Sequence, residues 1–403
     1  MTELLLHLTG AGADAALIPH AAARQRLGGG TVVHRIVIDA HTAARSRLAA
    51  QARRHGLGLL VDPQTHYFQD HQHPADDWAQ LPFATPDQLA PDQLTSGRVP
   101  HDLVAATIDF QLQAGATAII APYVHIERDD DGWLDAQLHL WDLTRAYLDR
   151  NKIRLPTLGL MALGWRLLAR PTWPAVLRPL VTGLQGLECT QIAVAAAKID
   201  CGTTAQQRMA SLLHLVPELN RTAPVLTWQQ GLLGPAAVAA GACGYQTGLG
   251  WRERCDLRTA QGHRRAPHGG GGGRPVYATP LGRSLPPAQV KLLLTDPVTR
   301  NALVCPVPEC CPTGWPGREI DRLAHTVTSR TRQLAALARI DRPEWRWEYL
   351  ACEAAHAEAF VDLVTRRRRR VATLPTLQSE VPAAIADLVE HRREIALQHR
   401  EAA

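Results

Sequence analysis

Short apolar stretches alternate with longer amphipathic stretches along most of this chain. The stretch 31–39 is rich in β-branched residues and stops at Asp39, and the stretch 57–62 repeats the pattern and stops at Asp62. Short apolar runs that end in a polar residue are typical of strands buried on both faces. Further strands are predicted at 116–125, 155–162, 190–200, 223–231, 245–247 and 274–282, with helices at 44–56, 102–114, 133–151, 171–187, 204–220 and 235–240.

This alternation predicts repeated strand–helix units and therefore a parallel sheet. Eight strands between residues 31 and 279 favour a closed (β/α)8 barrel of the TIM type over an open doubly wound sheet. A dinucleotide-binding fold would carry a GxGxxG turn after its first strand, and none follows 31–39. The first thirty residues are rich in alanine and end in three glycines, so we expect them to precede the first barrel strand.

Beyond residue 300 the pattern changes to long helical segments at 318–340, 343–370 and 379–402. A chain of 403 residues is long for one domain, and one large unit with an appendage is the natural expectation. We predict a barrel over 1–300, a zinc-binding knuckle over 301–330 and a helical C-terminal subdomain over 331–403.

Three of the eight cysteines lie in a short loop after the predicted barrel, and one histidine lies on the helix that follows this loop. Three thiolates and one imidazole are a donor set that closes a tetrahedral zinc site without water. Prolines between and after the cysteines, and the glycine at 314, supply a sharply turning backbone. We therefore predict a structural Zn²⁺ site, the alternative being ordinary cysteines in a turn-rich linker. Its ligands are Cys305, Cys310, Cys311 and His325.

Composition and charge narrow the class of protein. The hydrophobic fraction of 46% supports a sizeable core, and the net charge is +5. No apolar run reaches the length of a membrane span, and the N-terminus is acidic where a secretory signal would be basic, so we expect a cytoplasmic protein without a membrane partner.

Basic residues concentrate late in the chain. Such patches can contact phosphate backbones, although each can also be a solvated helix face or a flexible arm. The candidates for nucleic-acid contact are Arg252, Arg264, Arg265, Arg274, Arg366, Arg368 and Arg370.

In a barrel of this kind the functional residues lie at the carboxyl ends of the strands and in the following loops. Asp39 and Asp62 end neighbouring strands, where they could act as nucleophile and acid/base; each could instead cap the helix that follows. Lys198 could form a Schiff base or contact phosphate, or simply extend toward solvent. Candidate substrate-binding residues selected by the same rule are Tyr123, His125, Lys198, Gln229, Gln230 and Gln246.

An eight-stranded barrel, a cluster of three cysteines and one histidine, and a helical tail together resemble the tRNA-guanine transglycosylase superfamily, which includes relatives that insert 7-deazaguanines into DNA. In that family the ligands read Cys-x-Cys-x-x-Cys followed by a distant histidine, so the order here agrees while the spacing differs. Asp62 stands where the family has an aspartate in a DSGG-like turn, without the paired glycines. Gln246 and Thr247 stand where its nucleophilic aspartate is expected, and Asp256 lies nearby.

The resemblance implies a nucleic-acid-directed base-modifying or base-exchanging enzyme that acts on tRNA or DNA. Asp62, Asp39 and Asp256 would then be its catalytic carboxylates. One alternative is an inactive barrel that binds nucleic acid or protein within a larger assembly, including a homo-oligomer. Another is a small-molecule lyase or hydrolase that uses Lys198 and Asp200.

Overall fold

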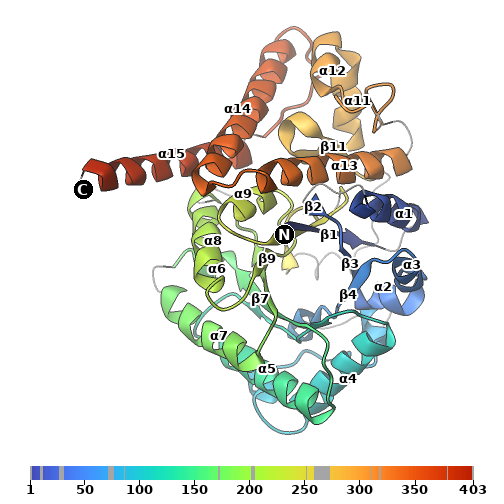
Figure 1. The fold of residues 1–403 in the computed structure, drawn as a ribbon, viewed down its shortest axis with the longest axis vertical. Helices are drawn as coiled ribbons and strands as arrows, with labels where there is room; N and C mark the ends of the chain where they lie inside the picture. The colour runs from blue at the N-terminus through green and yellow to red at the C-terminus, as the bar shows by residue number, and fades with distance from the viewer. Residues whose placement is uncertain are drawn as a thin grey trace.

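The computed structural model describes residues 2–9, 12–26, 31–70, 77–85, 87–170, 173–200, 205–250, 252–257, 273–308, 310–316, 319–378 and 380–401. Within these residues, eight parallel strands form a nearly closed barrel with helices on the outside, so the predicted TIM-like fold is confirmed (Figure 1). The strands are β1 (Thr2–Leu8), β3 (Arg35–Asp39), β4 (Gly58–Asp62), β5 (Ile119–Ile120), β7 (Thr157–Gly164), β8 (Gln191–Ala197), β9 (Val225–Thr227) and β10 (Gly244–Gly248).

The hydrogen-bonded order of the strands is β4-β3-β1-β10-β9-β8-β7-β5. Two short strands flank this path: β2 (Thr31–Val32) pairs with β1, and β6 (His125–Ile126) pairs with β7. The two ends of the path approach each other at Thr117, just before β5. Its backbone N–H donates to the carbonyl of Leu59 on β4 at 2.8 Å, and its hydroxyl accepts from the Leu59 N–H at 2.9 Å. These bonds bring the first and last strands together.

The structure corrects two of the predicted strands. The barrel begins with β1, which lies between β3 and β10, and the prediction that the chain enters the barrel at residue 31 is wrong. The apolar part of β1 is a run of leucines, which favours helix and strand about equally, so its sequence gives no clear strand signal. The eighth strand predicted at 274–282 is also wrong: β11 (Val276–Ala278) pairs antiparallel with β12 (Arg283–Leu285) in a separate hairpin.

Helices cover the outside of the barrel between successive strands (Figure 1). The last of them is α13 (Glu319–Ala338), which packs between α1 and α9 and against β1. The segment from β10 to α13 is therefore an insertion within the last strand–helix unit. The other helices of this layer are α1 (Gly12–Arg26), α2 (Ala40–Arg45), α3 (Leu48–Arg54), α4 (Val99–Gln113), α5 (Trp133–Arg150), α6 (Trp165–Leu168), α7 (Trp173–Leu187), α8 (Ala205–Leu219) and α9 (Gly234–Ala239). Short 3-10 turns lie at η1 (Thr65–Gln69), η2 (Trp78–Gln80), η3 (Pro91–Leu94) and η4 (Thr279–Leu281).

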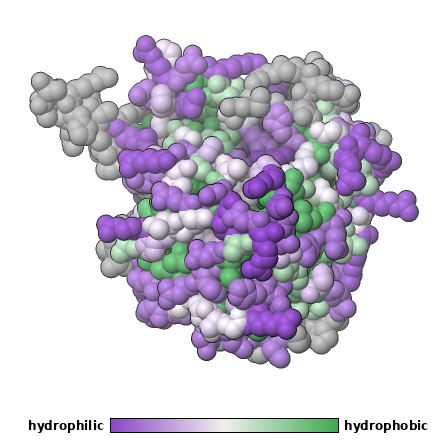
Figure 2. Space-filling model, turned by 60° about the horizontal axis from the view of Figure 1, so that its bottom comes forward, coloured by the Kyte–Doolittle hydropathy of each residue, from purple (hydrophilic) through white to green (hydrophobic). Residues whose placement is uncertain are grey.

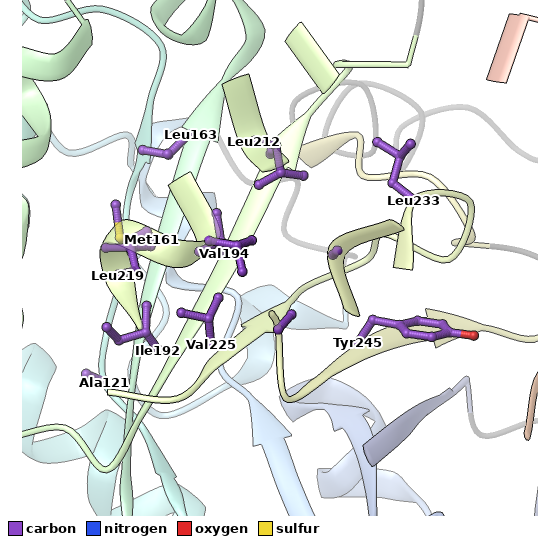
Figure 3. Close-up of a cluster of buried hydrophobic side chains, with 14 of the residues drawn as sticks. Ala121, Met161, Leu163, Ile192, Val194, Leu212, Leu219, Val225, Leu233 and Tyr245 are labelled. Carbon is purple, nitrogen blue, oxygen red and sulfur yellow. The ribbon is translucent and has the colours of Figure 1, made fainter. Parts of the chain in front are cut away.

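Alternation along each strand divides the core into two layers. On the outer face, Val194 of β8 and Val225 of β9 are buried in one cluster with Leu212 of α8 (Figure 3). On the inner face, Leu5, Val37 and other small or branched residues fill the barrel interior. Fully burying an aliphatic side chain of this size stabilises the fold by roughly 1.5–3 kcal/mol. The interior is thus a packed core between two polar ends. Arg35 bonds Glu3 and Gln191 at the amino-terminal end, and Asp39 and Asp62 lie at the carboxyl-terminal end.

A second core lies beside the barrel. The β11–β12 hairpin packs there with α11 (Pro287–Thr295), α12 (Pro297–Leu303) and α14 (Pro343–Arg368). The last helix, α15 (Glu380–Glu401), packs against α14 and against α8 of the barrel. Figure 1 shows the hairpin, α11, α12 and α14 above the barrel, α13 between the two parts, and α15 extending to the left at the level of α13. The hairpin and the C-terminal helices therefore form one packed region that starts well before residue 300.

The visible surface is largely hydrophilic, with apolar residues in small separate patches (Figure 2). Among the described helices, none combines the length and the apolar character needed to cross a bilayer.

Candidate active site and metal cluster

Two carboxylates lie side by side at the carboxyl-terminal mouth of the barrel. Asp39 ends β3 and Asp62 ends β4, and the two are partners in the strand register. Both are buried, and their side chains share the inner face with Val37 and Leu60. The sequence-based expectation that strand ends would bring Asp39 and Asp62 together is confirmed by this register.

Among the described residues, four loops that follow barrel strands contain a non-glycine residue in the left-handed region. These residues have φ between 52° and 58°, a conformation that costs side-chain-bearing residues free energy and often marks functional loops. They follow β4, β8, β9 and β10. The residues are Gln64, Lys198, Gln229 and Arg252.

Asp39 has two close basic partners and a third, His41, at 3.9 Å. His7 Nε2 lies 3.0 Å from Asp39 Oδ1, and Arg252 Nη1 lies 2.7 Å from Oδ2. Burial alone would raise the pKa of Asp39, but the guanidinium of Arg252 and the imidazole of His7 outweigh it and hold the pKa well below its usual range. Asp39 is therefore a permanently ionised carboxylate at neutral pH. Asp39 is the N-cap residue of α2, but its side chain makes no capping hydrogen bond to that helix.

Asp62 has neutral partners instead. Tyr123 Oη donates to Oδ1 at 2.9 Å, Trp228 Nε1 donates to Oδ2 at 3.4 Å, and the backbone N–H of Gln64 donates at 3.0 Å. Burial, and after it the negative charge of Asp39, raise the pKa of Asp62. Two adjacent carboxylates with pKa values shifted in opposite directions are a common basis for dividing acid and base roles.

Amide side chains gather at the carboxyl-terminal end of β9 and on the neighbouring β10. Gln246 Oε1 accepts from the backbone N–H of Gln229 at 2.5 Å, and Gln230 Nε2 donates to the carbonyl of Ala196 at 2.6 Å. Gln246 is fully buried, and its Nε2 has no hydrogen-bond partner in the described part of the chain. A buried donor without a partner costs about 1–3 kcal/mol, so the Gln246 amide is a natural contact for an acceptor atom of a ligand or water.

Other predicted site residues lie at the rim. Lys198 is about two-fifths exposed and pairs with Asp256 at 3.5 Å, so the structure joins these two to each other and not to Asp62. Asp200 pairs with Arg254 at 3.0 Å. His125 is buried on β6, with its Nε2 3.6 Å from Glu127.

No protein-family model and no curated protein matches this chain.

Cys305, Cys310, Cys311 and His325 come together, with their ligand atoms all within 4.8 Å of one another. His325 Nδ1 lies 3.3 Å from Cys310 Sγ and 3.4 Å from Cys311 Sγ, and the two sulfurs are 3.6 Å apart. Ligand bonds of about 2.3 Å to sulfur and about 2.0 Å to nitrogen, at tetrahedral angles, place two sulfurs about 3.8 Å apart and a sulfur and a nitrogen about 3.5 Å apart. The four residues can therefore hold a metal ion.

The loop around the cysteines forms as the sequence suggests. Gly314 adopts φ 77°, and its carbonyl accepts from the backbone N–H of Cys305 at 2.7 Å, which folds the segment back on itself. The other ring nitrogen of His325, Nε2, lies 3.4 Å from the hydroxyl of Thr279. An outer partner of this kind orients a ligating imidazole.

One buried ion pair ties α13 to the barrel mouth. Arg330, five residues after His325, is fully buried; its Nη2 lies 2.6 Å from Glu253 Oε1, and its Nη1 donates to the carbonyl of Gly231 at 2.7 Å. Glu253 lies between Arg252 and Arg254 in the loop after β10. The metal-cluster helix therefore helps to position the loop that holds Asp39.

The candidate nucleic-acid contacts separate into three groups. Arg274 is buried in an ion pair with Asp14 at 2.5 Å, so the prediction that it contacts phosphate on the surface is not supported by its position. Arg264 and Arg265 lie outside the described residues. The remaining predicted contacts at the end of α14 are exposed: Arg366, Arg368 and Arg370.

Sequence reasoning missed His7 and assigned Arg252 to phosphate rather than to Asp39. His7 was missed because β1 was not recognised as a strand. The leucine run gives no clear strand signal, and the one available indication is that a polar residue, His7, directly follows this run, as Asp39 and Asp62 follow theirs. The partnership of Arg252 with Asp39 joins residues 213 positions apart, and no local pattern indicates it.

Proposed function

We propose that this protein is a nucleic-acid-directed enzyme that exchanges a base by breaking and re-forming an N-glycosidic bond. The observation that carries the proposal is the Asp39–Asp62 pair at the barrel mouth, in which one carboxylate is ionised and the pKa of the other is raised. The resemblance in architecture to tRNA-guanine transglycosylases supports the same reaction class.

The two carboxylates suit the two needs of this reaction. Departure of a base leaves positive charge on the sugar, which an ionised carboxylate such as Asp39 stabilises. The departing base must gain a proton, and a carboxyl group with a raised pKa such as Asp62 donates one more readily. When a new base attacks, Asp62 takes the proton back.

In this proposal Trp228 and Gln246, at the carboxyl-terminal end of the barrel, recognise the base. The indole of Trp228 is buried beside Asp62 and offers an apolar surface, and Gln246 offers its unpartnered amide N–H2. A planar heterocycle with a carbonyl oxygen matches these groups. A base in a nucleic-acid strand would leave its stack to reach them.

The metal at the Cys305–His325 cluster is assigned as Zn²⁺ in this proposal. Three sulfurs and one imidazole nitrogen favour zinc among the metals that accept four-coordinate sites, and they leave no position for water. The ion would hold the loop of the cysteines against α13, and through α13 it would support Arg330. Its role is therefore structural.

A base-exchange assay tests the proposal. Protein is incubated with radiolabelled guanine and either bulk tRNA or DNA, and incorporation of label into polymer is measured, with a 7-deazaguanine as competitor. We expect Asp62→Asn and Asp39→Asn to lower incorporation by a factor of about 10²–10⁴. Asp142→Asn on the outer surface of α5 is the matched control and should act like wild type. Wild-type protein that labels neither polymer would overturn the proposal.

One observation favours a second candidate, an inactive barrel that only binds its partner. The carboxylate of Asp39 is paired with both His7 and Arg252, and strand β10 carries the amide of Gln246 where the resemblance places a nucleophilic carboxylate. Salt-sensitive binding of tRNA or DNA that is unchanged in Asp62→Asn, without any incorporation of label, would select this candidate.

A further inference from the structure

The residues assigned to base exchange are closed off from solvent. Asp39, Asp62, Trp228 and Gln246 are each at most 1% exposed, although they lie at the carboxyl-terminal mouth of the barrel. Groups buried in this way cannot meet a substrate until part of their cover moves. The proposed reaction therefore requires a segment over the mouth that opens.

One part of this cover is a short segment of the loop that follows β10. Cys255 and Leu257 are each 2% exposed and belong to the apolar cluster that fills the barrel interior. Among the described residues, the other members of this cluster lie on the barrel strands or directly beside them. The cluster includes Tyr123 and Trp228, whose side chains donate to Asp62. The two loop side chains therefore plug the mouth on the side of Asp62.

The start of this segment is firmly anchored. Arg252 pairs with the buried Asp39 at 2.7 Å, and Glu253 pairs with the fully buried Arg330 at 2.6 Å. Pairs with buried members are costly to separate, because a buried charge would be left without its partner. The backbone N–H of Gly248 on β10 also donates to the Arg252 carbonyl at 3.1 Å. These contacts fix the segment to β3, α13 and β10.

The far end of the segment is held more weakly. Arg254 Nε lies 3.0 Å from Asp200 Oδ2, and Asp256 Oδ1 lies 3.5 Å from Lys198 Nζ. The basic side chain of each pair is about two-fifths exposed, so water and salt weaken both pairs. The backbone N–H of Lys198 also donates to the Cys255 carbonyl at 2.8 Å. All three contacts are made to the segment that follows β8, so one movement releases them together.

We propose that residues 254–257 are a lid that opens away from the segment after β8, while Arg252 and Glu253 stay in place as its anchor. Opening takes the two apolar side chains out of the mouth and gives a substrate access to Asp62, and closure excludes water from the reaction. The anchor keeps Arg252 on the carboxylate of Asp39 while the lid moves. The identity of the substrate rests on the proposed function, whereas the lid follows from the packing of the segment.

The reactivity of Cys255 measures opening of the lid. Wild type is treated with N-ethylmaleimide without substrate, and the modified fraction of each cysteine is followed by mass spectrometry of its peptide. Burial, and after it the negative charge of nearby carboxylates, hold the pKa of the Cys255 thiol well above its usual range, so the closed state should react slowly. Raising sodium chloride from about 50 mM to about 500 mM should accelerate the reaction about twofold to fivefold, because salt screens the two exposed pairs.

Two variants open the lid in different ways. Leu257→Ala removes most of the apolar plug and should raise the rate at Cys255 by at least about tenfold. Lys198→Gln removes the exposed pair with Asp256 and should raise the rate about twofold to fivefold; loss of a positive charge does not lower the pKa of the thiol, so a faster reaction reports opening. Arg98→Gln removes an exposed pair on the outer surface and is the matched control, with an unchanged rate.

A second cysteine separates opening of the lid from unfolding. Cys243 lies at the amino-terminal end of the barrel, where its thiol is 3.3 Å from Gln191 Nε2. Acceleration at Cys255 with an unchanged rate at Cys243 supports the lid. Equal acceleration at both cysteines in Lys198→Gln, or a Cys255 rate that responds neither to salt nor to the variants, overturns it. Lys198→Gln leaves the buried plug intact, so the test holds even if Leu257→Ala unfolds the barrel.

The lid and the proposed function fail separately, because the labelling is done without substrate. Opening at Cys255 in a protein that exchanges no base would keep the lid and remove base exchange. Base exchange by a protein whose Cys255 rate matches wild type in every variant would remove the lid and keep the proposed function.

Discussion

Replacing Arg330 by methionine should destabilise the protein strongly, because it leaves Glu253 buried without its counter-charge. Arg330 is fully buried, donates to Glu253 at 2.6 Å and to the Gly231 carbonyl at 2.7 Å, and its guanidinium lies 4.8 Å from the centre of the Tyr277 ring. Removing one member of a buried pair costs about 3–5 kcal/mol, because the other charge stays buried. The two hydrogen bonds from Ser284 to Glu253 remain and place the expected loss toward the lower end.

Urea unfolding of Arg330→Met, Glu253→Gln and the double variant measures this cost. We expect Arg330→Met alone to lower the free energy of unfolding by about 3 kcal/mol and the double variant to lose less than the sum of the two single variants, since a neutral amide needs no counter-charge. Arg98→Met removes an exposed pair with Asp102 and should cost under about 1 kcal/mol. A loss below about 1 kcal/mol for Arg330→Met would refute the reasoning that Glu253 depends on this ion pair.

Three further predictions follow from the same structure. Purified protein should contain zinc, and Cys311→Ser and His325→Ala should lose it, which elemental mass spectrometry measures. Thr279→Val should only weaken zinc affinity, by about tenfold, which chelator competition measures. The pKa of Asp39 is lowered, so the stability that this carboxylate contributes is present above its unfolded pKa of about 3.9 and is lost as the pH falls through its folded pKa. The pKa of Asp62 is raised, so ionisation of Asp62 at neutral pH destabilises the folded state. Thermal melting at neutral pH should therefore show Asp39→Asn less stable and Asp62→Asn at least as stable as wild type, and the reverse order would contradict the assignment. Gly244→Ala should cost about 3 kcal/mol or more in urea unfolding because its Cβ would lie 2.1 Å from the Glu3 carbonyl oxygen, whereas Gly186→Ala on α7, with its nearest neighbour at 3.9 Å, should be neutral or stabilising.

Sequence reasoning located the strand ends that form the mouth, since Asp39 and Asp62 each follow an apolar run. It also selected Cys305 and His325 as parts of one metal cluster, because cysteines that crowd into a proline-rich turn have few other uses. Both inferences depend on residues that are close in the sequence, so they do not require knowledge of the tertiary contacts. It did not find β1, whose leucine run has no distinctive strand composition, and it placed a barrel strand at 274–282, where the chain forms a hairpin.

The sequence by itself therefore determined the alternation of strands and helices, the polar residues at the strand ends and the donor set of the metal cluster. Each of these features depends on residues that are close together in the sequence. Only the tertiary structure decided which groups meet. It showed that Arg252 holds Asp39 while Asp62 has neutral partners, and that Arg330 joins the metal-cluster helix to the mouth. These pairings set the charge state of each carboxylate. They join residues far apart in the chain, and the burial that gives them their strength exists only after the barrel has closed.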